Sequence, residues 1–169
     1  EILKDSFSFE IGIRGIEYNE ISDVLYGIIK KGFKYPFDLE FEYKDKDKTY
    51  LNIFNHKQIS IEYSSSNIAN GSVSGDNIYI LEKGNKFIAG ICDGMGKGNN
   101  ANLESSTIIS LFNRLLTSSI ATETSLQILN LYCELKKEYD SYSTVDIMEI
   151  NTQSKKGVFY KMSAASSYI

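Results

Sequence analysis

The chain has 169 residues, and 18 Lys and Arg stand against 22 Asp and Glu, a net charge of −4. The hydrophobic share of 42% and the charged share of 24% are those of a globular protein of about one domain. With Arg14 and Arg114 as its only arginines, the acidic chain is not expected to bind nucleic acid. No apolar run approaches the roughly 18 residues of a membrane helix, and no signal peptide is visible, so we expect a cytoplasmic chain without direct membrane contact.

The ends of the chain and its cysteines and histidine bound the chemistry further. The sequence begins at Glu1 without a Met and stops at Ile169 inside a strand pattern, so we expect a piece of a larger protein. Cys92 and Cys133 form neither a disulfide framework nor a metal-ligand spacing, and we expect both to be reduced. His56, the single histidine, lies in a polar stretch without a nucleophile partner and is expected in a solvated loop.

The first 62 residues are expected to form a small α/β regulatory or linking segment. Apolar residues at helical spacing predict a helix over 21–32, with Gly32 at its C-terminal end. Alternating apolar residues predict strands over 7–15, 38–43, 49–54 and 58–63. This segment carries no catalytic constellation. The small polar stretch that follows, 64–75, is a linker or a loop that approaches a ligand.

A β-hairpin carries the strongest chemical signal. Strands are predicted over 77–82 and 86–92, and Gly84-Asn85 between them suits a type II′ turn. With these two residues at the centre of the turn, the numbers of opposed residues add up to 169. Asp76 then lies opposite Asp93 at the open end of the hairpin.

Two opposed aspartates indicate a metal site. Opposed residues on an antiparallel pair have Cβ atoms about 5 Å apart, so the carboxylates repel unless they are protonated or bridged by a cation. Such oxygen donors suit Mg²⁺ or Mn²⁺, and the glycines after Asp93 (Gly94, Gly96 and Gly98) allow the backbone to approach an ion or a phosphate. The alternatives are aspartates that point apart into solvent, or a register slip of one residue.

Three better-known motifs are excluded in this region. Met95 and Lys97 occupy positions of an EF-hand loop that need oxygen ligands. The stretch 90–97 has one residue too many for a phosphate loop, and Gly98 stands where Ser or Thr would hold magnesium. Asn99 replaces the third glycine of a dinucleotide fingerprint.

Two helices and two strands are expected after the glycines. The first helix is capped by Asn99 or Asn100, has Glu104 in its first turn, and presents an apolar face over 103–116 that is either core or a dimer surface. The second helix starts near Thr124, with Thr122 or Thr124 as its cap. Strands are predicted over 144–150 and 157–162, and Asp146 faces either the site or the surface.

An ordered set of sequence pieces over about residues 69–169 resembles a known family. The pieces are Ser74-Gly75-Asp76-Asn77, Asp93 to Gly98, Glu104-Ser105-Ser106, Tyr142 to Asp146, and Lys161 to Ile169. They are similar to the stage II sporulation protein E type of the PPM metal-dependent serine/threonine phosphatases. The resemblance implies an α+β fold of the PPM type, a layered α/β/β/α sandwich, of which residues 63–169 are the N-terminal portion.

The resemblance also implies a mechanism and partners. Asp76, Asp93 and the carbonyl of Gly94 fall on the family's metal-binding positions, and the complete domain holds two Mn²⁺ or Mg²⁺ ions. A metal-activated water attacks the phosphorus of phosphoserine or phosphothreonine in a phosphorylated, anti-anti-sigma-factor-like regulatory protein. A homodimer is a further candidate assembly, and a membrane tether in the parent protein stays open.

One departure from the family pattern matters. The family's other metal-binding aspartates lie in a later Asp-Gly motif and near the C-terminus, and this chain ends before both. The sandwich is therefore expected to be truncated, with an unpaired strand edge near 160–169, and the chain alone weakly active or inactive. The alternative function is a non-catalytic regulatory module that keeps the hairpin and docks a partner.

Overall fold

The computed structural model describes residues 8–33, 35–69, 73–96, 98–136 and 143–168. The chain divides into two compact units. The first unit comprises Glu1–Ile61 with the turn segments Glu82–Phe87 and Asn151–Lys156. The second unit comprises Glu62–Leu81, Ile88–Ile150 and Gly157–Ile169.

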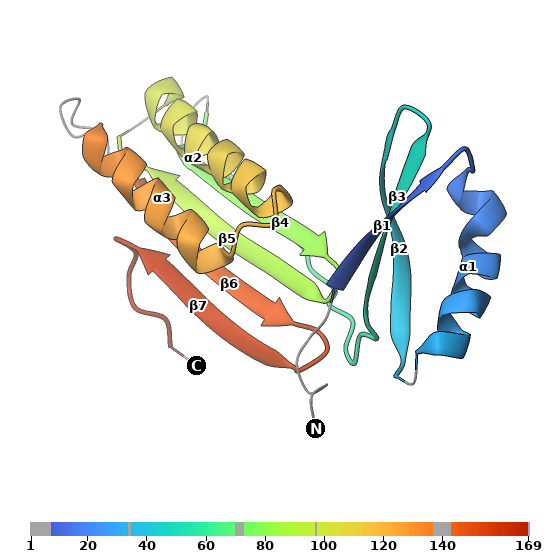
Figure 1. The fold of residues 1–169 in the computed structure, drawn as a ribbon. Helices are drawn as coiled ribbons and strands as arrows, with labels where there is room; N and C mark the ends of the chain where they lie inside the picture. Colours follow the sequence, from blue (N-terminus) through green and yellow to red (C-terminus); the bar gives the residue numbers. More distant parts are fainter. Residues whose placement is uncertain (1–7, 34, 70–72, 97, 137–142, 169) are drawn as a thin grey trace. The chain divides into compact units, whose positions relative to one another are not determined.

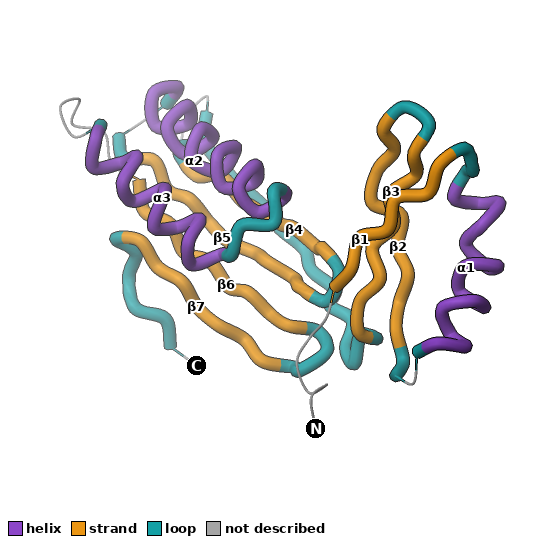
Figure 2. The backbone as a smooth tube through the Cα atoms, viewed as in Figure 1, coloured by secondary structure: helices purple, strands orange, loops and turns teal. Residues whose placement is uncertain are grey.

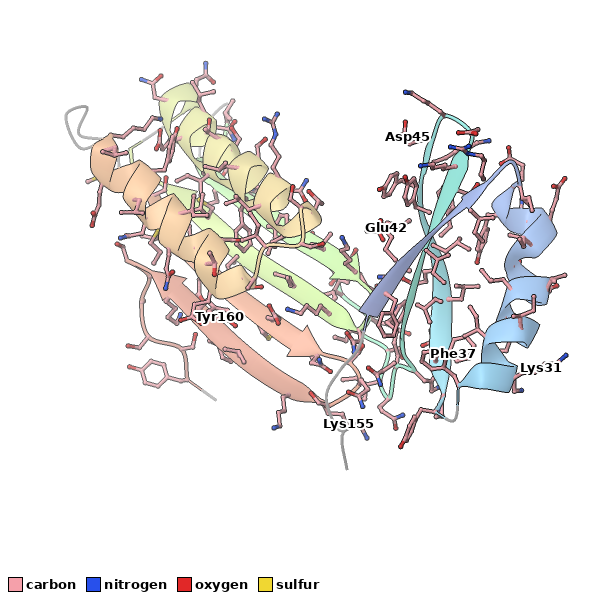
Figure 3. All side chains as sticks on the ribbon, in the orientation of Figure 1. Lys31, Phe37, Glu42, Asp45, Lys155 and Tyr160 are labelled. Atoms are coloured by element: carbon pink, nitrogen blue, oxygen red, sulfur yellow. The ribbon has the colours of Figure 1, made fainter. Side chains whose placement is uncertain are left out.

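The first unit contains a three-stranded antiparallel sheet with a helix on one face (Figure 1). Its elements are β1 (Ser8–Arg14), α1 (Tyr18–Gly32), β2 (Phe37–Asp45) and β3 (Lys48–Asn55), and the strand order is β1-β3-β2. Aromatic side chains fill the space between α1 and the sheet. The rings of Tyr26 and Phe37 lie 4.8 Å apart, and Phe37 is seen between β2 and the helix in Figure 3.

Strand β3 is the centre of the first unit because both of its faces are covered. Leu51 and Ile53 are buried on one face, while Phe54 is fully buried on the other. Near Phe54 lies Gly84 of the 82–87 turn, where a Cβ would be 3.5 Å from the phenyl ring. The sheet residues and the turn residues of this unit therefore share one core.

The strand expected over 58–63 is absent, and this prediction was wrong. The segment after β3 is irregular (Figure 2). The backbone N–H groups of Gln58 and Ile59 both donate to the carbonyl of Thr152, at 2.8 and 3.2 Å. Because these donors end on a turn of the same unit, they are not available to a strand ladder.

The second unit contains a four-stranded sheet with two helices on one face (Figure 1). Its elements are β4 (Asp76–Lys83), β5 (Lys86–Gly94), α2 (Asn99–Thr117), α3 (Thr122–Leu135), β6 (Ser143–Asn151) and β7 (Lys156–Met162), and the strand order is β4-β5-β6-β7. The core lies between the helices and the sheet, and it includes Tyr79, Ile88, Cys92, Ile108, Phe112, Leu129, Val145 and Ile147.

The helix boundaries differ from the expectation in detail. Helix α2 begins at Asn99 after Gly98, and its cap makes no side-chain hydrogen bond, so neither Asn99 nor Asn100 is the cap. Helix α3 begins at Thr122 after Ala121, and the Thr122 hydroxyl bonds to Glu149 rather than to the helix backbone. The predicted caps were wrong, since Gly98 and Ala121 occupy the cap positions.

The apolar face of α2 is largely core. Ile108, Phe112 and Leu116 are buried, whereas Leu103 is 67% exposed. Of the two interpretations of this face, the packing of these three residues supports core. The α+β fold class is confirmed by the two sheets and their helices. No helix in the described ranges is both long and apolar enough to cross a membrane.

Gly90 on β5 provides a test of the packing between β5 and β6. A Cβ at this position would lie 2.1 Å from Cδ1 of Ile147 and 2.7 Å from the carbonyl oxygen of Asp146. We predict that Gly90→Ala lowers the free energy of unfolding by about 1–3 kcal/mol, because the backbone oxygen cannot move aside without disturbing the strand pair. Urea denaturation followed by circular dichroism measures this change.

Gly27→Ala on α1 is the matched control. Nothing lies within 4 Å of a Cβ at this exposed helical position. The same substitution should therefore stabilise the chain by about 0.5–1 kcal/mol. Equal effects of the two substitutions would contradict the close approach of β5 and β6.

Candidate metal centre

The register of the β4–β5 hairpin is the one that the sequence predicts. Gly84 has φ 58° and Asn85 is not among the described non-glycine residues with positive φ, as a type II′ turn requires. At the other end of the hairpin, the N–H of Gly94 donates to the carbonyl of Gly75 at 3.2 Å. This bond makes Gly75 and Gly94 an opposed pair, so Asp76 lies opposite Asp93. The register slip is excluded.

The two aspartates meet at a close position in the ladder. The pair next to a hydrogen-bonded pair in an antiparallel ladder is a non-hydrogen-bonded pair, whose Cα atoms lie only about 4.5 Å apart. The carboxyl groups of Asp76 and Asp93 are hydrogen-bonded to each other. This proximity argues against aspartates that point apart, although both side chains are exposed to solvent.

The electrostatics of Asp76 and Asp93 favour a proton or a cation between the two carboxyl groups. Asp93 is exposed, but the neighbouring protein atoms partly desolvate its carboxyl group and raise its pKa above the ordinary value, and the hydrogen bond to Asp76 and the negative charge of Asp76 raise it further. Two carboxyl groups that share a hydrogen bond need either a proton or a cation between them. In the described part of the chain, neither aspartate forms an ion pair with a basic side chain.

The other acidic side chains of the region have lysine partners. Asp146 on β6 is paired with Lys161 on β7, which neutralises its charge. Glu104 on α2 is paired with Lys136 at 3.2 Å. Asp146 therefore has a structural partner of its own, and of its two expected roles the site role gains no support.

The prediction for Glu104 was wrong in position and in environment. Because α2 begins at Asn99, Glu104 lies in the second turn of the helix rather than the first. Its side chain is buried, and Lys136 beyond the end of α3 compensates its charge. Glu104 thus joins α2 to the end of α3 and does not act on the helix dipole.

Gly94 is required by packing against the start of α2. A Cβ on Gly94 would lie 2.0 Å from the carbonyl oxygen of Ala101. A Cβ on Gly75 would lie 3.0 Å from Cβ of Ala101 and 3.1 Å from the carbonyl oxygen of Gly94. Gly94 at the end of β5 and Gly75 just before β4 therefore let α2 approach the open end of the hairpin. Gly96 and Gly98 have φ 101° and 69°, and Lys97 lies outside the described residues.

Two residues of α2 that the sequence left without a role hold the strand that carries Asp76. Asn102 donates from Nδ2 to the carbonyl of Ser74 at 2.8 Å. The hydroxyl of Ser105 donates to the carbonyl of Gly75 at 2.5 Å. In the sequence, Ser105 was marked only as part of the Glu104-Ser105-Ser106 piece of the family resemblance, without a role of its own, and Asn102 was not marked.

The donor set is small and consists of oxygen atoms. No group of three or more His, Cys, Asp or Glu side chains in the described ranges could hold a metal ion. Asp76 and Asp93 with the carbonyl of Gly94 remain, and carboxylate and carbonyl oxygens are the ligands of hard divalent cations. These residues fit Mn²⁺ or Mg²⁺ in chemistry and would supply part of a coordination sphere.

Nucleophilic catalysis by a cysteine has no support. Cys92 and Cys133 are free thiols, as expected. Cys92 is buried, and burial raises its pKa to about 12, so it is protonated at neutral pH. His56 is exposed, as expected, with Nδ1 2.8 Å from Oδ1 of Asp38.

Comparison with known proteins points to one family. The profile of the Stage II sporulation protein E (SpoIIE) family matches residues 83–168. Stage II sporulation protein E of Bacillus subtilis (strain 168) is 35% identical over 100 residues, which are 59% of this chain and 12% of that protein. The protein of the same name from Priestia megaterium is 31% identical over 100 residues, 59% of this chain and 17% of that protein. The chain thus spans less than a fifth of either relative.

A solved structure shows the same fold over nearly the whole chain. It is the PP2C phosphatase domain with a fragment of the regulatory domain of SpoIIE from Bacillus subtilis, with a TM-score of 0.59 and 21% identity. The match covers 98% of this chain and 54% of that chain. The PPM-type fold expected from the sequence is confirmed. Since the family match extends over just over half of its residues, the chain belongs to the stage II sporulation protein E (SpoIIE) family.

Proposed function

We propose that this chain contributes to a metal-dependent protein serine/threonine phosphatase, with Asp76, Asp93 and the carbonyl of Gly94 as metal ligands. The observation that carries the proposal is the opposed pair of aspartates at the end of the hairpin, hydrogen-bonded to each other and without a lysine or arginine partner in the described part of the chain. Membership of the SpoIIE family supports the same class of activity.

In this proposal the hairpin residues bind a divalent cation at a fixed position. A bound Mn²⁺ or Mg²⁺, two ions in a complete domain, supplies a Lewis acid that activates water and stabilises the charge on a phosphoryl group. Asp76 and Asp93 would hold the ion with their carboxylates, and their close spacing on the hairpin would fix where it lies. Gly94 brings a backbone oxygen to the same end of the hairpin.

The proposed substrate is chosen by analogy with the family, and the proposed location from the sequence. We propose a phosphoserine or phosphothreonine on an anti-anti-sigma-factor-like regulatory protein as the substrate, and a cytoplasmic location. Residues 1–62 are proposed as the regulatory or linking segment, and 63–169 as the N-terminal portion of the phosphatase domain. A homodimer is the proposed assembly. This chain alone is proposed to be weakly active or inactive.

One observation favours a second candidate function. The described residues bring together two carboxylates and no third metal-ligating side chain. A regulatory module that keeps the hairpin and docks a partner would need no complete metal centre. In the phosphatase the charge of Asp93 is needed to bind the metal ion, whereas the docking module does not need it for a metal centre.

Phosphatase activity in the full-length protein tests the proposed function. We predict that Asp93→Asn or Asp76→Asn, each introduced into the protein that contains this chain, abolishes Mn²⁺-dependent hydrolysis of a phosphoserine peptide, because each removes a metal ligand. Asp146→Asn is the control and should retain activity, since Asp146 is paired with Lys161. Full hydrolysis by Asp93→Asn would contradict the phosphatase assignment and favour the docking module.

Thermal stability against Mn²⁺ concentration tests the site in this chain. A ligand that binds only the folded state stabilises it by about 2.7 kcal/mol at a hundredfold excess over its Kd. We predict a saturable rise in the melting temperature of the wild-type chain, no rise for Asp93→Asn, and a normal rise for Asp146→Asn. An equal rise in all three would place the binding elsewhere on the chain.

The pH dependence of stability without metal tests the carboxyl pair. The pKa of Asp93 is raised above its ordinary value of 3.8 in the folded chain. This group therefore favours the folded state fully below pH 3.8 and loses that contribution as the pH rises through the folded pKa. We predict that metal-free Asp93→Asn melts at a higher temperature than the wild type at pH 7, and that the difference shrinks as the pH falls towards 3.8.

In saturating Mn²⁺ the wild type should melt at a higher temperature than Asp93→Asn, because only the wild type is stabilised by the ion. A lower melting temperature of metal-free Asp93→Asn at pH 7 would show that the aspartates do not repel each other.

A further inference from the structure

Ser105 is a fully buried polar residue in the second turn of α2. Burial of a hydroxyl is unfavourable unless it is hydrogen-bonded, and the Ser105 hydroxyl is fully used. It donates to the carbonyl of Gly75 at 2.5 Å and accepts from Nδ2 of Asn77 at 2.7 Å. Gly75 and Asn77 are the two chain neighbours of Asp76. The Ser105 hydroxyl thus holds the backbone of Gly75 before Asp76 and the side chain of Asn77 after it.

The carbonyl of Gly75 links three elements. It accepts from Ser105 on α2 and from the N–H of Gly94 on β5, next to Asp93. The position of Asp76 relative to Asp93 is therefore set by the strand ladder on one side and by Ser105 on the other. Asn102 adds a parallel bond one residue earlier, to the carbonyl of Ser74.

Among the described residues, Asp76 itself is restrained through its backbone and the facing carboxyl group. Its N–H donates to the hydroxyl of Ser74 at 3.1 Å, and its carbonyl accepts from Nδ2 of Asn67 at 2.7 Å. Strand β4 begins at Asp76, so the hydrogen bonds of the strand ladder restrain Asp76 from one side only. The bonds from Ser105 supply the restraint at the end where β4 starts.

We propose that Ser105 is a positioning residue of the metal centre, which holds Asp76 in register with Asp93 so that both carboxylates meet one cation. This inference rests on the proposed function, because it assigns a role toward the ion that Asp76 and Asp93 would bind. Loss of an outer interaction that orients a metal ligand weakens metal affinity by about 10- to 100-fold, and Ser105 orients Asp76 through its two chain neighbours, Gly75 and Asn77. Ser105 does not touch the ion and acts through Asp76.

Ser125 on α3 offers a matched control. It is also fully buried and also helical, but its hydroxyl has no hydrogen-bond partner in the described part of the structure. Ser125→Ala therefore removes an equally buried oxygen without a link to the hairpin. Ser105→Ala and Ser125→Ala separate a role in metal binding from a general role in the core.

The experiment is a titration of the purified chain with Mn²⁺ alone, with free Mn²⁺ measured by electron paramagnetic resonance. Wild type, Ser105→Ala, Ser125→Ala and Asp93→Asn are compared, and circular dichroism checks that each is folded. We expect the Kd for Mn²⁺ to rise about 10- to 100-fold in Ser105→Ala and to stay within about twofold of wild type in Ser125→Ala. Asn77→Ala, which removes the donor to Ser105 and leaves the helix intact, should also raise the Kd and serves if Ser105→Ala does not fold.

The outcomes separate the positioning role from the metal centre. If wild type and Asp93→Asn bind Mn²⁺ equally or not at all, the metal centre and the role of Ser105 are both overturned. If Asp93→Asn loses binding while Ser105→Ala or Asn77→Ala keeps the wild-type Kd, the metal centre stands and the role of Ser105 is overturned. A raised Kd in Ser105→Ala with a normal Kd in Ser125→Ala supports the proposal.

Discussion

The contact between the open end of the β4–β5 hairpin and the start of α2 is the constraint on which the candidate centre depends. The backbone of Gly94 approaches Ala101 so closely that a Cβ would lie 2.0 Å from the Ala101 oxygen. The same approach brings Ser105 to the carbonyl of Gly75. A larger residue at position 94 would separate the helix from the hairpin, and the bonds that hold the strand of Asp76 would be lost with it.

The carboxyl pair sits at this constrained end as an unfavourable feature of the metal-free chain. Other acidic groups nearby are neutralised, Asp146 by Lys161 and Glu104 by Lys136, whereas Asp76 and Asp93 face each other. Like charges at this distance oppose folding, and a cation between them favours it. A carboxyl pair of this kind at the end of a hairpin is the arrangement that a divalent cation would stabilise.

The sequence predicted the hairpin well because its signals are local. The Gly84-Asn85 turn and strict strand alternation determine the register, and the register alone places Asp76 opposite Asp93. The sequence-based predictions were wrong where the partner of a residue lies far away along the chain. The backbone N–H groups of Gln58 and Ile59 donate to the carbonyl of Thr152 instead of to a neighbouring strand. The buried carboxylate of Glu104 is paired with Lys136. The bond from Ser105 to Gly75 spans 30 residues, and no local pattern encodes it.

The number of ligands explains why affinity and activity should be separated in this chain. Magnesium requires about six oxygen ligands in octahedral arrangement, and usually keeps several waters when few carboxylates bind it. Two carboxylates and one carbonyl would hold an ion whose remaining positions are filled by water. The affinity of this chain for Mn²⁺ then reports how well the hairpin and α2 arrange Asp76 and Asp93 in advance. Phosphatase activity would need further ligands in addition, so a well-positioned pair could bind an ion firmly and still hydrolyse little.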